Sequence, residues 1–134
     1  MTKSKILVAD DEEDVVETVR FRLEREGFEV VTAENGLEAL GAARVHLPDL
    51  LILDVMMPGE NGYRVSRMIR EDQEVGAFPA DAKILLLTAR DLRQEPEREQ
   101  TMMEFSGADR ALYKPFELDE LVETVNSMLA DDGS

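Results

Sequence analysis

The chain has 134 residues, of which 43% are hydrophobic and 34% are charged, as expected for one soluble globular domain. It contains no cysteine, which excludes a disulfide framework and thiol chemistry, and no apolar stretch of the roughly 18 residues that a membrane span requires. Thirty acidic residues against fifteen basic ones give a net charge of −15, which disfavours direct binding to the phosphate backbone of nucleic acids.

Five short apolar runs predict β-strands. They span residues 6–9, 28–32, 50–53, 83–87 and 111–113. The chain enters the first run without the pattern of a signal peptide, so we expect a cytoplasmic protein. The run at 50–53 is apolar throughout, which predicts a strand that is covered on both faces of its sheet.

A helix is predicted after each of these strands. Apolar residues recur at helical spacing within 15–23, 37–43, 65–69 and 118–129, and Pro96 suits the first turn of a helix that ends at about Ser106. Gly27 and Pro48 mark the ends of the first two helices. This repeated βα alternation predicts an α/β fold with a parallel sheet, helices on both faces and right-handed crossovers. We expect one domain over residues 1–134, with a core at about 4–130 and a short polar tail at 131–134.

Polar and charged residues stand where the predicted strands end. The first strand is followed by Asp10 and Asp11, the third by Asp54, the fourth by Thr88 and Ala89, and the fifth by Lys114 and Pro115. In open parallel sheets, ligands bind beyond the carboxyl ends of the strands. We therefore expect three carboxylates, a hydroxyl group and an ammonium group to converge at one edge of the sheet.

Converging carboxylates require a counter-charge. Two carboxylates about 4 Å apart repel each other by roughly 4 kcal/mol at an effective dielectric constant of about 20. Oxygen ligands suit Mg²⁺, which usually shares its coordination sphere with phosphate oxygens. Thr88 and Lys114 supply hydrogen-bond donors for such oxygens. The sequence therefore predicts a phosphoryl-transfer site in which an aspartate can act as the acceptor.

The motifs DD, LDVMMPGENG, TAR and KPF follow one another in this order at the strand ends. With them the chain resembles the receiver domain of two-component response regulators over about residues 4 to 130. The resemblance implies a flavodoxin-like, doubly wound sheet with strand order 2-1-3-4-5. It also implies a signalling switch that accepts a phosphoryl group from a sensor histidine kinase or a histidine phosphotransfer protein. Such domains catalyse their own phosphotransfer and dephosphorylation, so we expect no turnover of a separate substrate.

Carried over by position, the resemblance makes Asp54 the phosphoacceptor and implies a metal site around it. Asp10 and Asp11 match the acidic pair that holds Mg²⁺, for which Mn²⁺ could substitute, and Asp11 matches the more direct ligand. Asp54 shares this ion. Met56 occupies the position whose backbone carbonyl binds the metal, so the type of its side chain is not decisive.

The remaining motif residues match groups that contact the phosphoryl group. Thr88 matches the switch hydroxyl that moves toward it, the backbone N–H of Ala89 faces it, and Lys114 binds it. Pro115 matches a proline that is preceded by a cis peptide bond, a conformation plausible only before proline. The resemblance also implies that phosphorylation changes the surface around the fourth strand, the helix after it and the fifth strand, where a partner then binds.

One departure from the family pattern concerns the aromatic residue that usually stands three positions before the lysine. Ala111 occupies that position, and Tyr113 lies next to Lys114 and points to the opposite face of the strand. The usual aromatic switch is therefore in question. This departure supports an alternative function, a degenerate receiver that acts as a phosphorylation-independent binding module.

Two further departures concern the region after the fourth strand. The interval from Thr88 to Lys114 is about four residues longer than expected for compact receivers, and we assign the extra length to RDLRQEPEREQ. Met56 and Arg90 occupy positions that in the family border the path of hydrolytic water. We expect these two residues to alter the lifetime of the phosphoryl group.

Two acidic segments have simpler explanations. Glu12, Glu13 and Asp14 are expected only to start a helix, because acidic residues favour the first turn. The PEREQ run is expected to be a solvated helix face.

Two other classes of protein fit the sequence less well. A hydrolase of the haloacid dehalogenase type would need a second aspartate where Met56 stands, and a flavodoxin would need a Ser/Thr/Gly-rich loop in place of DDEED. The output could be a separate downstream protein or a fused output domain, and the phosphorylated protein could form a homodimer. Neither nucleic acid nor a membrane is expected as a direct partner.

Overall fold

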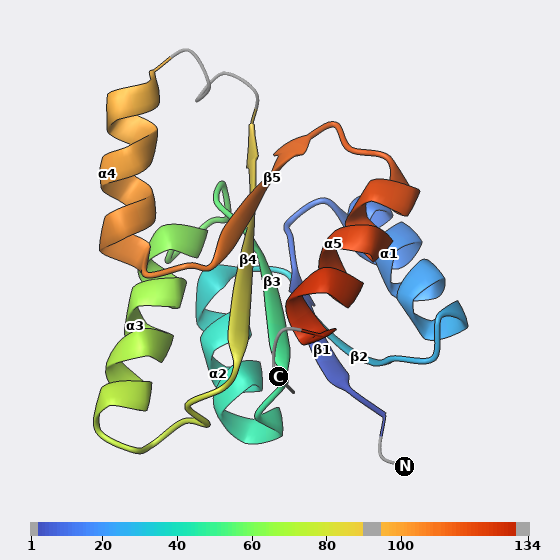
Figure 1. The fold of residues 1–134 in the computed structure, drawn as a ribbon, viewed down its shortest axis with the longest axis horizontal. Coiled ribbons are helices and arrows are strands. Elements are labelled where there is room, and N and C mark those ends of the chain that lie inside the picture. Colours follow the sequence, from blue (N-terminus) through green and yellow to red (C-terminus); the bar gives the residue numbers. More distant parts are fainter. Residues whose placement is uncertain (1–2, 90–94, 131–134) are drawn as a thin grey trace.

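The computed structural model describes residues 3–89 and 95–130, which alternate between strands and helices (Figure 1). The strands are β1 (Lys5–Ala9), β2 (Glu29–Ala33), β3 (Leu50–Asp54), β4 (Lys83–Ala89) and β5 (Arg110–Lys114). The helices are α1 (Glu13–Arg25), α2 (Gly36–His46), α3 (Gly62–Glu74), α4 (Pro96–Ser106) and α5 (Leu118–Ala130). All ten predicted elements are present, and the predicted polar tail at 131–134 lies outside the described residues.

The strands form one parallel sheet in the order β2-β1-β3-β4-β5. This is the doubly wound, flavodoxin-like order that the resemblance implied. The helices α1 and α5 cover one face of the sheet, and α2, α3 and α4 cover the other (Figure 1). None of the described helices is long and apolar enough to cross a membrane.

The core has two halves, one on each face of the sheet, and β3 contributes to both. Leu51 and Leu53 pack with residues of α2 and α3, whereas Leu50 and Ile52 pack with residues of α1 and α5. All four side chains are fully buried. This confirms that the apolar run at 50–53 is a strand covered on both faces, and it fixes the position of Asp54 at the end of that strand.

The helix ends follow from local residue chemistry. The side chains of Asn35 and Asn61 accept hydrogen bonds from the first turns of α2 and α3, as N-cap residues do. Pro96 lies in the first turn of α4, and Gly107, with a φ of 70°, ends that helix in the left-handed conformation that suits glycine.

The fourth strand is longer than predicted. It continues through Thr88 and Ala89, which pair with Tyr113 and Lys114 of β5. The apolar run ends at Leu87, but backbone pairing does not depend on side-chain polarity, so the strand continues to the edge of the sheet. As a result, the backbones of Thr88 and Ala89 belong to the sheet itself.

Candidate functional site

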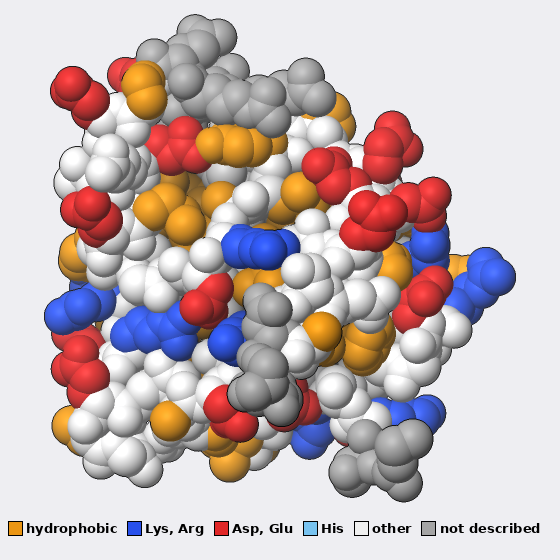
Figure 2. Space-filling model, in the orientation of Figure 1, with side chains coloured by type: hydrophobic (Ala, Val, Ile, Leu, Met, Phe, Trp, Pro, Cys, Tyr) orange, Lys and Arg blue, Asp and Glu red, His pale blue; other side chains and the backbone are white. Residues whose placement is uncertain are grey.

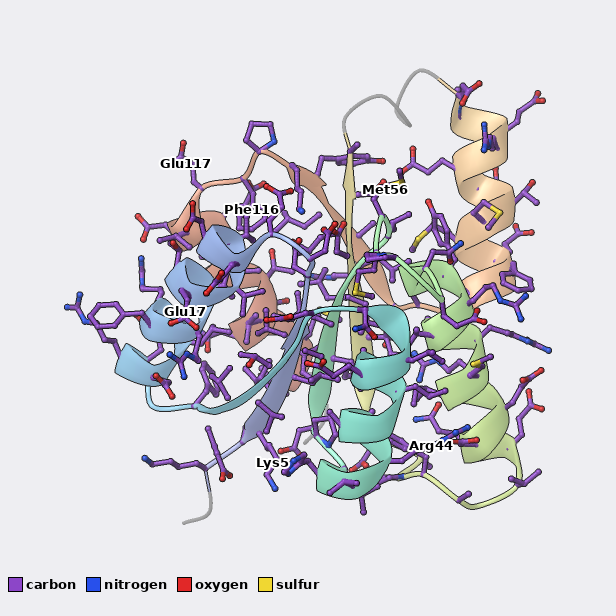
Figure 3. All side chains as sticks on the ribbon, turned by 180° about the vertical axis from the view of Figure 1, so that it is seen from behind. Lys5, Glu17, Arg44, Met56, Phe116 and Glu117 are labelled. Carbon is purple, nitrogen blue, oxygen red and sulfur yellow. The ribbon has the colours of Figure 1, made fainter. Side chains whose placement is uncertain are left out.

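The predicted site residues meet at the carboxyl ends of the strands. Asp10 directly follows β1, and Asp54 and Lys114 are the last residues of β3 and β5. A cavity of about 250 Å³ opens among them and is lined by Asp11, Glu12, Asp54, Met56, Ala89 and Lys114. Figure 3 shows the labelled Met56 and Phe116 at this end of the molecule, whereas Lys5 and Arg44 lie toward the opposite end.

Lys114 is the positive centre of the site. Its Nζ lies 2.7 Å from Asp10 Oδ2, 3.3 Å from Glu12 Oε1 and 3.4 Å from Asp54 Oδ2. Burial lowers the pKa of Lys114, but the hydrogen bond to Asp10 and the surrounding carboxylate charges raise it further, so the pKa ends above its ordinary value. Lys114 therefore stays protonated and links the ends of β1, β3 and β5.

Asp54 is a buried carboxylate with a perturbed proton affinity. Its side chain is almost fully buried, and its Oδ1 accepts a hydrogen bond of 3.2 Å from the backbone N–H of Met56. Burial raises the pKa of Asp54, and the negative charge of Asp10 raises it further. The hydrogen bond from Met56 and the positive charge of Lys114 lower it by less, so the pKa reaches about 6. Asp54 is thus held where a negative charge is incompletely compensated.

The acidic cluster beside Asp54 has the composition of a site for a divalent cation. One carboxylate oxygen from each of Asp10, Asp11 and Glu12 lies within 4.8 Å of the others. Asp10 is fully buried, and Lys114 is the cation that pairs with three of the carboxylates here, those of Asp10, Glu12 and Asp54. Oxygen ligands with an excess of negative charge match the preference of Mg²⁺, so the residues fit this ion.

Glu12 corrects the expectation from the sequence. We expected Glu12, like Glu13 and Asp14, only to start α1, and all three do lie at its start. However, the Glu12 side chain makes no capping hydrogen bond and reaches Lys114 instead, while its backbone N–H donates to Asp10 Oδ1 at 3.0 Å. Glu12 therefore belongs both to the helix start and to the charged site.

Thr88 places a hydroxyl group inside the same end of the sheet. The side chain is buried, and its Oγ1 makes no hydrogen bond of good geometry with any of the described residues. An unpaired buried hydroxyl group is costly unless another group uses it. Ala89 follows and lines the cavity, and the Lys114–Pro115 peptide bond is cis, as expected. Arg90, predicted to border the path of hydrolytic water, lies outside the described residues.

Ala111 holds the β5 position that is usually aromatic in receivers. It packs against the half of the core that lies between the sheet and the helices α2, α3 and α4. Tyr113 lies on the same face of β5 as Ala111, so the expectation that it points to the opposite face is wrong. Its hydroxyl group donates a hydrogen bond to Glu99 of α4. Glu99 is half-buried, so the expectation that the whole PEREQ run is a solvated face is wrong at this residue. The other members of the run are exposed.

Residues 6–126 match the family described as the response regulator receiver domain. The chain belongs to this family. Among curated proteins, the receiver domain is 40% identical over 125 residues to the alkaline phosphatase synthesis transcriptional regulatory protein PhoP of Bacillus subtilis, covering 93% of this chain and 48% of PhoP. It is also 32% identical over 127 residues to protein PilH of Pseudomonas aeruginosa, covering 95% of this chain and 98% of PilH.

Solved structures agree with this assignment. The chemotaxis response regulator CheY4 of Vibrio cholerae superposes with a TM-score of 0.82 at 31% identity, covering 95% of this chain and 99% of that one. The receiver domain therefore spans nearly the whole of CheY4 and PilH, but about half the length of PhoP.

Proposed function

We propose that this receiver domain is a phosphorylation-dependent signalling switch whose phosphoacceptor is Asp54. The observation that carries the proposal is the position of Asp54 at the end of β3, 3.4 Å from Lys114 and beside the Asp10, Asp11 and Glu12 carboxylates. A buried, incompletely compensated carboxylate that faces a cavity marks a candidate functional site, and an aspartate there can act as a nucleophile.

The transfer itself is a displacement at phosphorus. One carboxylate oxygen of Asp54 forms the new P–O bond, and the P–N bond of a donor phosphohistidine breaks, leaving its electron pair on the imidazole. With a pKa of about 6, Asp54 is mostly ionised at neutral pH and is available to attack. Lys114, already 3.4 Å from Asp54, is placed to pair with the phosphoryl oxygens that arrive there.

Asp10, Asp11, Asp54 and the backbone carbonyl of Met56 are the groups that would hold Mg²⁺ or, with the same ligand preferences, Mn²⁺. The bound ion would neutralise charge on the carboxylates and on the phosphoryl oxygens. The fit rests on the buried Asp10 and the shared excess of negative charge at the cavity. Within this arrangement Asp11 is exposed and Asp10 is buried, so Asp11 is the ligand open to solvent.

Thr88 and Ala89 complete the proposed phosphoryl site. Thr88 brings a buried hydroxyl group that has no hydrogen bond of good geometry among the described residues, so it is a proposed donor to a phosphoryl oxygen. The backbone N–H of Ala89, at the end of β4, is the second proposed donor. Movement of Thr88 toward the phosphoryl group would then carry the signal to α4 and β5.

The proposed phosphodonor is a sensor histidine kinase or a histidine phosphotransfer protein. Exposed acidic residues stand next to the site, at the start of α5, where Glu117, Asp119 and Glu120 contribute to a negative surface (Figure 2). A basic surface on the donor would complement them and speed the encounter. The output would pass to a downstream protein or to an output domain on the same chain, because the net charge disfavours DNA binding by this segment itself.

Phosphorylation by a small donor tests the proposal. Incubation with acetyl phosphate and Mg²⁺ should add one phosphoryl group by intact-mass analysis, with acetate as the leaving group. Asp54→Asn should remain unmodified, whereas Asp81→Asn, a change of the same kind at an exposed residue, should be modified like the wild type. An adduct of equal yield on Asp54→Asn would refute the assignment.

The absence of an aromatic residue at Ala111 supports a second candidate, a binding module that does not depend on phosphorylation. Fluoroberyllate, which mimics a phosphoryl group on aspartate, separates the two. A response that requires Mg²⁺ and Asp54 supports the switch, and binding of partners without any such response supports the module.

A further inference from the structure

Glu12 lies where two neighbouring cavities meet at the carboxyl end of the sheet. The cavity of about 250 Å³ at Asp54 and a groove of about 540 Å³ between α1 and the end of β5 share Glu12, Ala89 and Lys114 in their linings. The rest of the groove is mostly apolar and includes Val15, Val19, Pro115, Phe116 and Leu118. Glu12 therefore stands on the border between the proposed phosphorylation site and the surface next to it.

The side chain of Glu12 is exposed although it reaches into the site. It makes no capping hydrogen bond at the start of α1, and its Oε1 lies 3.3 Å from Lys114 Nζ. The Glu12 side chain is 63% exposed, whereas Asp10 and Asp54, the other two carboxylates that pair with Lys114, are almost completely buried. Of these three carboxylates, Glu12 is thus the one that faces a molecule arriving from solvent.

The charge at this end of the sheet stays negative even when the proposed metal site is filled. Four carboxylates lie here with the ammonium group of Lys114, and they belong to Asp10, Asp11, Glu12 and Asp54. A divalent cation and the ammonium group together balance three of these four negative charges. Glu12 is not among the proposed metal ligands, so its charge remains at the exposed side of the cavity.

The charge of Glu12 is close enough to act on an incoming phosphoryl group. Glu12 Oε1 and Asp54 Oδ2 lie 3.3 Å and 3.4 Å from the same Nζ atom of Lys114, so they are less than about 7 Å apart. Even at the dielectric constant of water, two unit charges about 7 Å apart change an equilibrium or rate constant by about threefold. A phosphodonor is an anion, so Glu12 opposes its approach to Asp54 by about this factor for each negative charge that the donor carries.

We propose that Glu12 determines which class of phosphodonor this site accepts. It disfavours small, freely diffusing anions such as acyl phosphates, relative to a phosphoryl group that a protein presents on a histidine. The inference rests on the proposed role of Asp54 as the phosphoacceptor. A protein donor offsets the charge of Glu12, because its imidazole leaving group carries no negative charge and basic residues around its histidine can pair with the exposed carboxylate.

Rates of phosphorylation by two small donors of different charge test the inference. Glu12→Gln removes the charge but keeps an oxygen that can accept a hydrogen bond from Lys114. At saturating Mg²⁺ and low ionic strength, intact-mass time courses should show that acetyl phosphate, a dianion at neutral pH, modifies this variant about sevenfold faster than the wild type. Phosphoramidate, which carries a single negative charge, should gain only about threefold. Glu13→Gln, the same change at the next exposed residue, should leave both rates nearly unchanged.

Two further measurements separate the charge of Glu12 from a general disturbance of the site. At an ionic strength of about 1 M, where the Debye length is about 3 Å, the gain in Glu12→Gln should disappear. Calorimetric titration without any phosphodonor should show that this variant binds Mg²⁺ about threefold or more weakly than the wild type, because the same charge attracts cations. A damaged site would react more slowly and bind the ion more weakly, whereas loss of the charge changes the two in opposite directions.

The inference is overturned if Glu12→Gln reacts with acetyl phosphate no faster than the wild type, which would assign Glu12 to holding Lys114 in place. It is also overturned if the gain is equal for both donors or persists at high ionic strength. The wild type separates this failure from that of the proposed function. A wild type that takes no phosphoryl group on Asp54 refutes the function and the inference together, whereas normal phosphorylation of Asp54 at a rate that Glu12→Gln does not change refutes the inference alone.

Discussion

Replacing Asp54 with asparagine should stabilise the metal-free protein at neutral pH. The Asp54 side chain is 3% exposed, and burial together with the charge of Asp10 raises its pKa to about 6. Folding therefore places a negative charge where the protonated form is preferred. Asparagine keeps the shape of the side chain without the charge, and Lys114 retains Asp10 and Glu12 as partners.

The magnitude follows from the folded and unfolded pKa values of Asp54. The folded value is about 6 against an ordinary value of 3.8, and each pKa unit corresponds to about 1.4 kcal/mol, so the ionised group costs about 3 kcal/mol of folding free energy. Because the folded pKa is raised, the contribution of this carboxyl group to stability is fully present below 3.8 and is lost as the pH rises through about 6. Asp54→Asn should match the wild type at about pH 4 and exceed it by about 2–3 kcal/mol at about pH 8.

Urea denaturation followed by circular dichroism, in the presence of a chelator, measures this difference across the pH range. Asp81→Asn, which removes one exposed carboxylate, is the control and should show a small difference at every pH. Added Mg²⁺ should stabilise the wild type, by about 2.7 kcal/mol at a hundredfold excess over its Kd, and should stabilise Asp54→Asn less. The reasoning is refuted if Asp54→Asn is less stable than the wild type at about pH 8, or if the difference does not depend on pH.

Three further substitutions test the metal site, the loop after β3 and the core. Asp11→Asn should weaken Mg²⁺ binding by about tenfold in calorimetric titration, because it removes the exposed carboxylate of the acidic cluster, whereas Glu13→Gln should leave the affinity nearly unchanged; similar losses in both would contradict the assignment. Gly62→Ala should destabilise the protein by about 1–3 kcal/mol and slow its phosphorylation, because the new Cβ would lie 2.5 Å from the Asp54 carbonyl oxygen; an unchanged rate with acetyl phosphate would argue against this contact. Ile52→Ala should cost about 2–5 kcal/mol in urea denaturation, since Ile52 is fully buried in the core, and a loss below about 1 kcal/mol would contradict that packing.

The sequence predicted the fold and most of the site because the relevant signals are local. Apolar runs and helical spacing identify the elements, and the residues that follow a strand lie where that strand ends. With parallel strands in the order 2-1-3-4-5, which only the family resemblance implied, Asp10, Asp54, Thr88 and Lys114 meet at one edge of the sheet. No long-range packing detail enters this inference.

Glu12 could not be assigned in this way. Its position satisfies the ordinary preference of acidic residues for a helix start, and that preference alone explains its presence. Its contact with Lys114 joins residues 102 positions apart, and depends on how α1 and β5 meet in space. One sequence feature could have pointed to Glu12: it directly follows Asp10 and Asp11, which were already assigned to the site. A side chain at that position can reach the same cavity.

The contact between Tyr113 and Glu99 illustrates a second limit. The alternation of β5 puts Tyr113 and Ala111 on one face, contrary to our expectation from the sequence, and it does not indicate which side chain of α4 lies opposite. PEREQ has the composition of a solvated helix face, and only the packing of α4 against β5 turns Glu99 inward. A lone half-buried carboxylate in an exposed run gives no periodic signal.

The most direct test of the central claim locates the phosphoryl group on the chain. After reaction with acetyl phosphate and Mg²⁺, sodium borohydride reduces an aspartyl phosphate to homoserine, and peptide mass spectrometry identifies the residue that was converted. The account predicts homoserine at position 54, dependent on Mg²⁺. Conversion at another aspartate, such as Asp10 or Asp11, or conversion that does not require Mg²⁺, would contradict it.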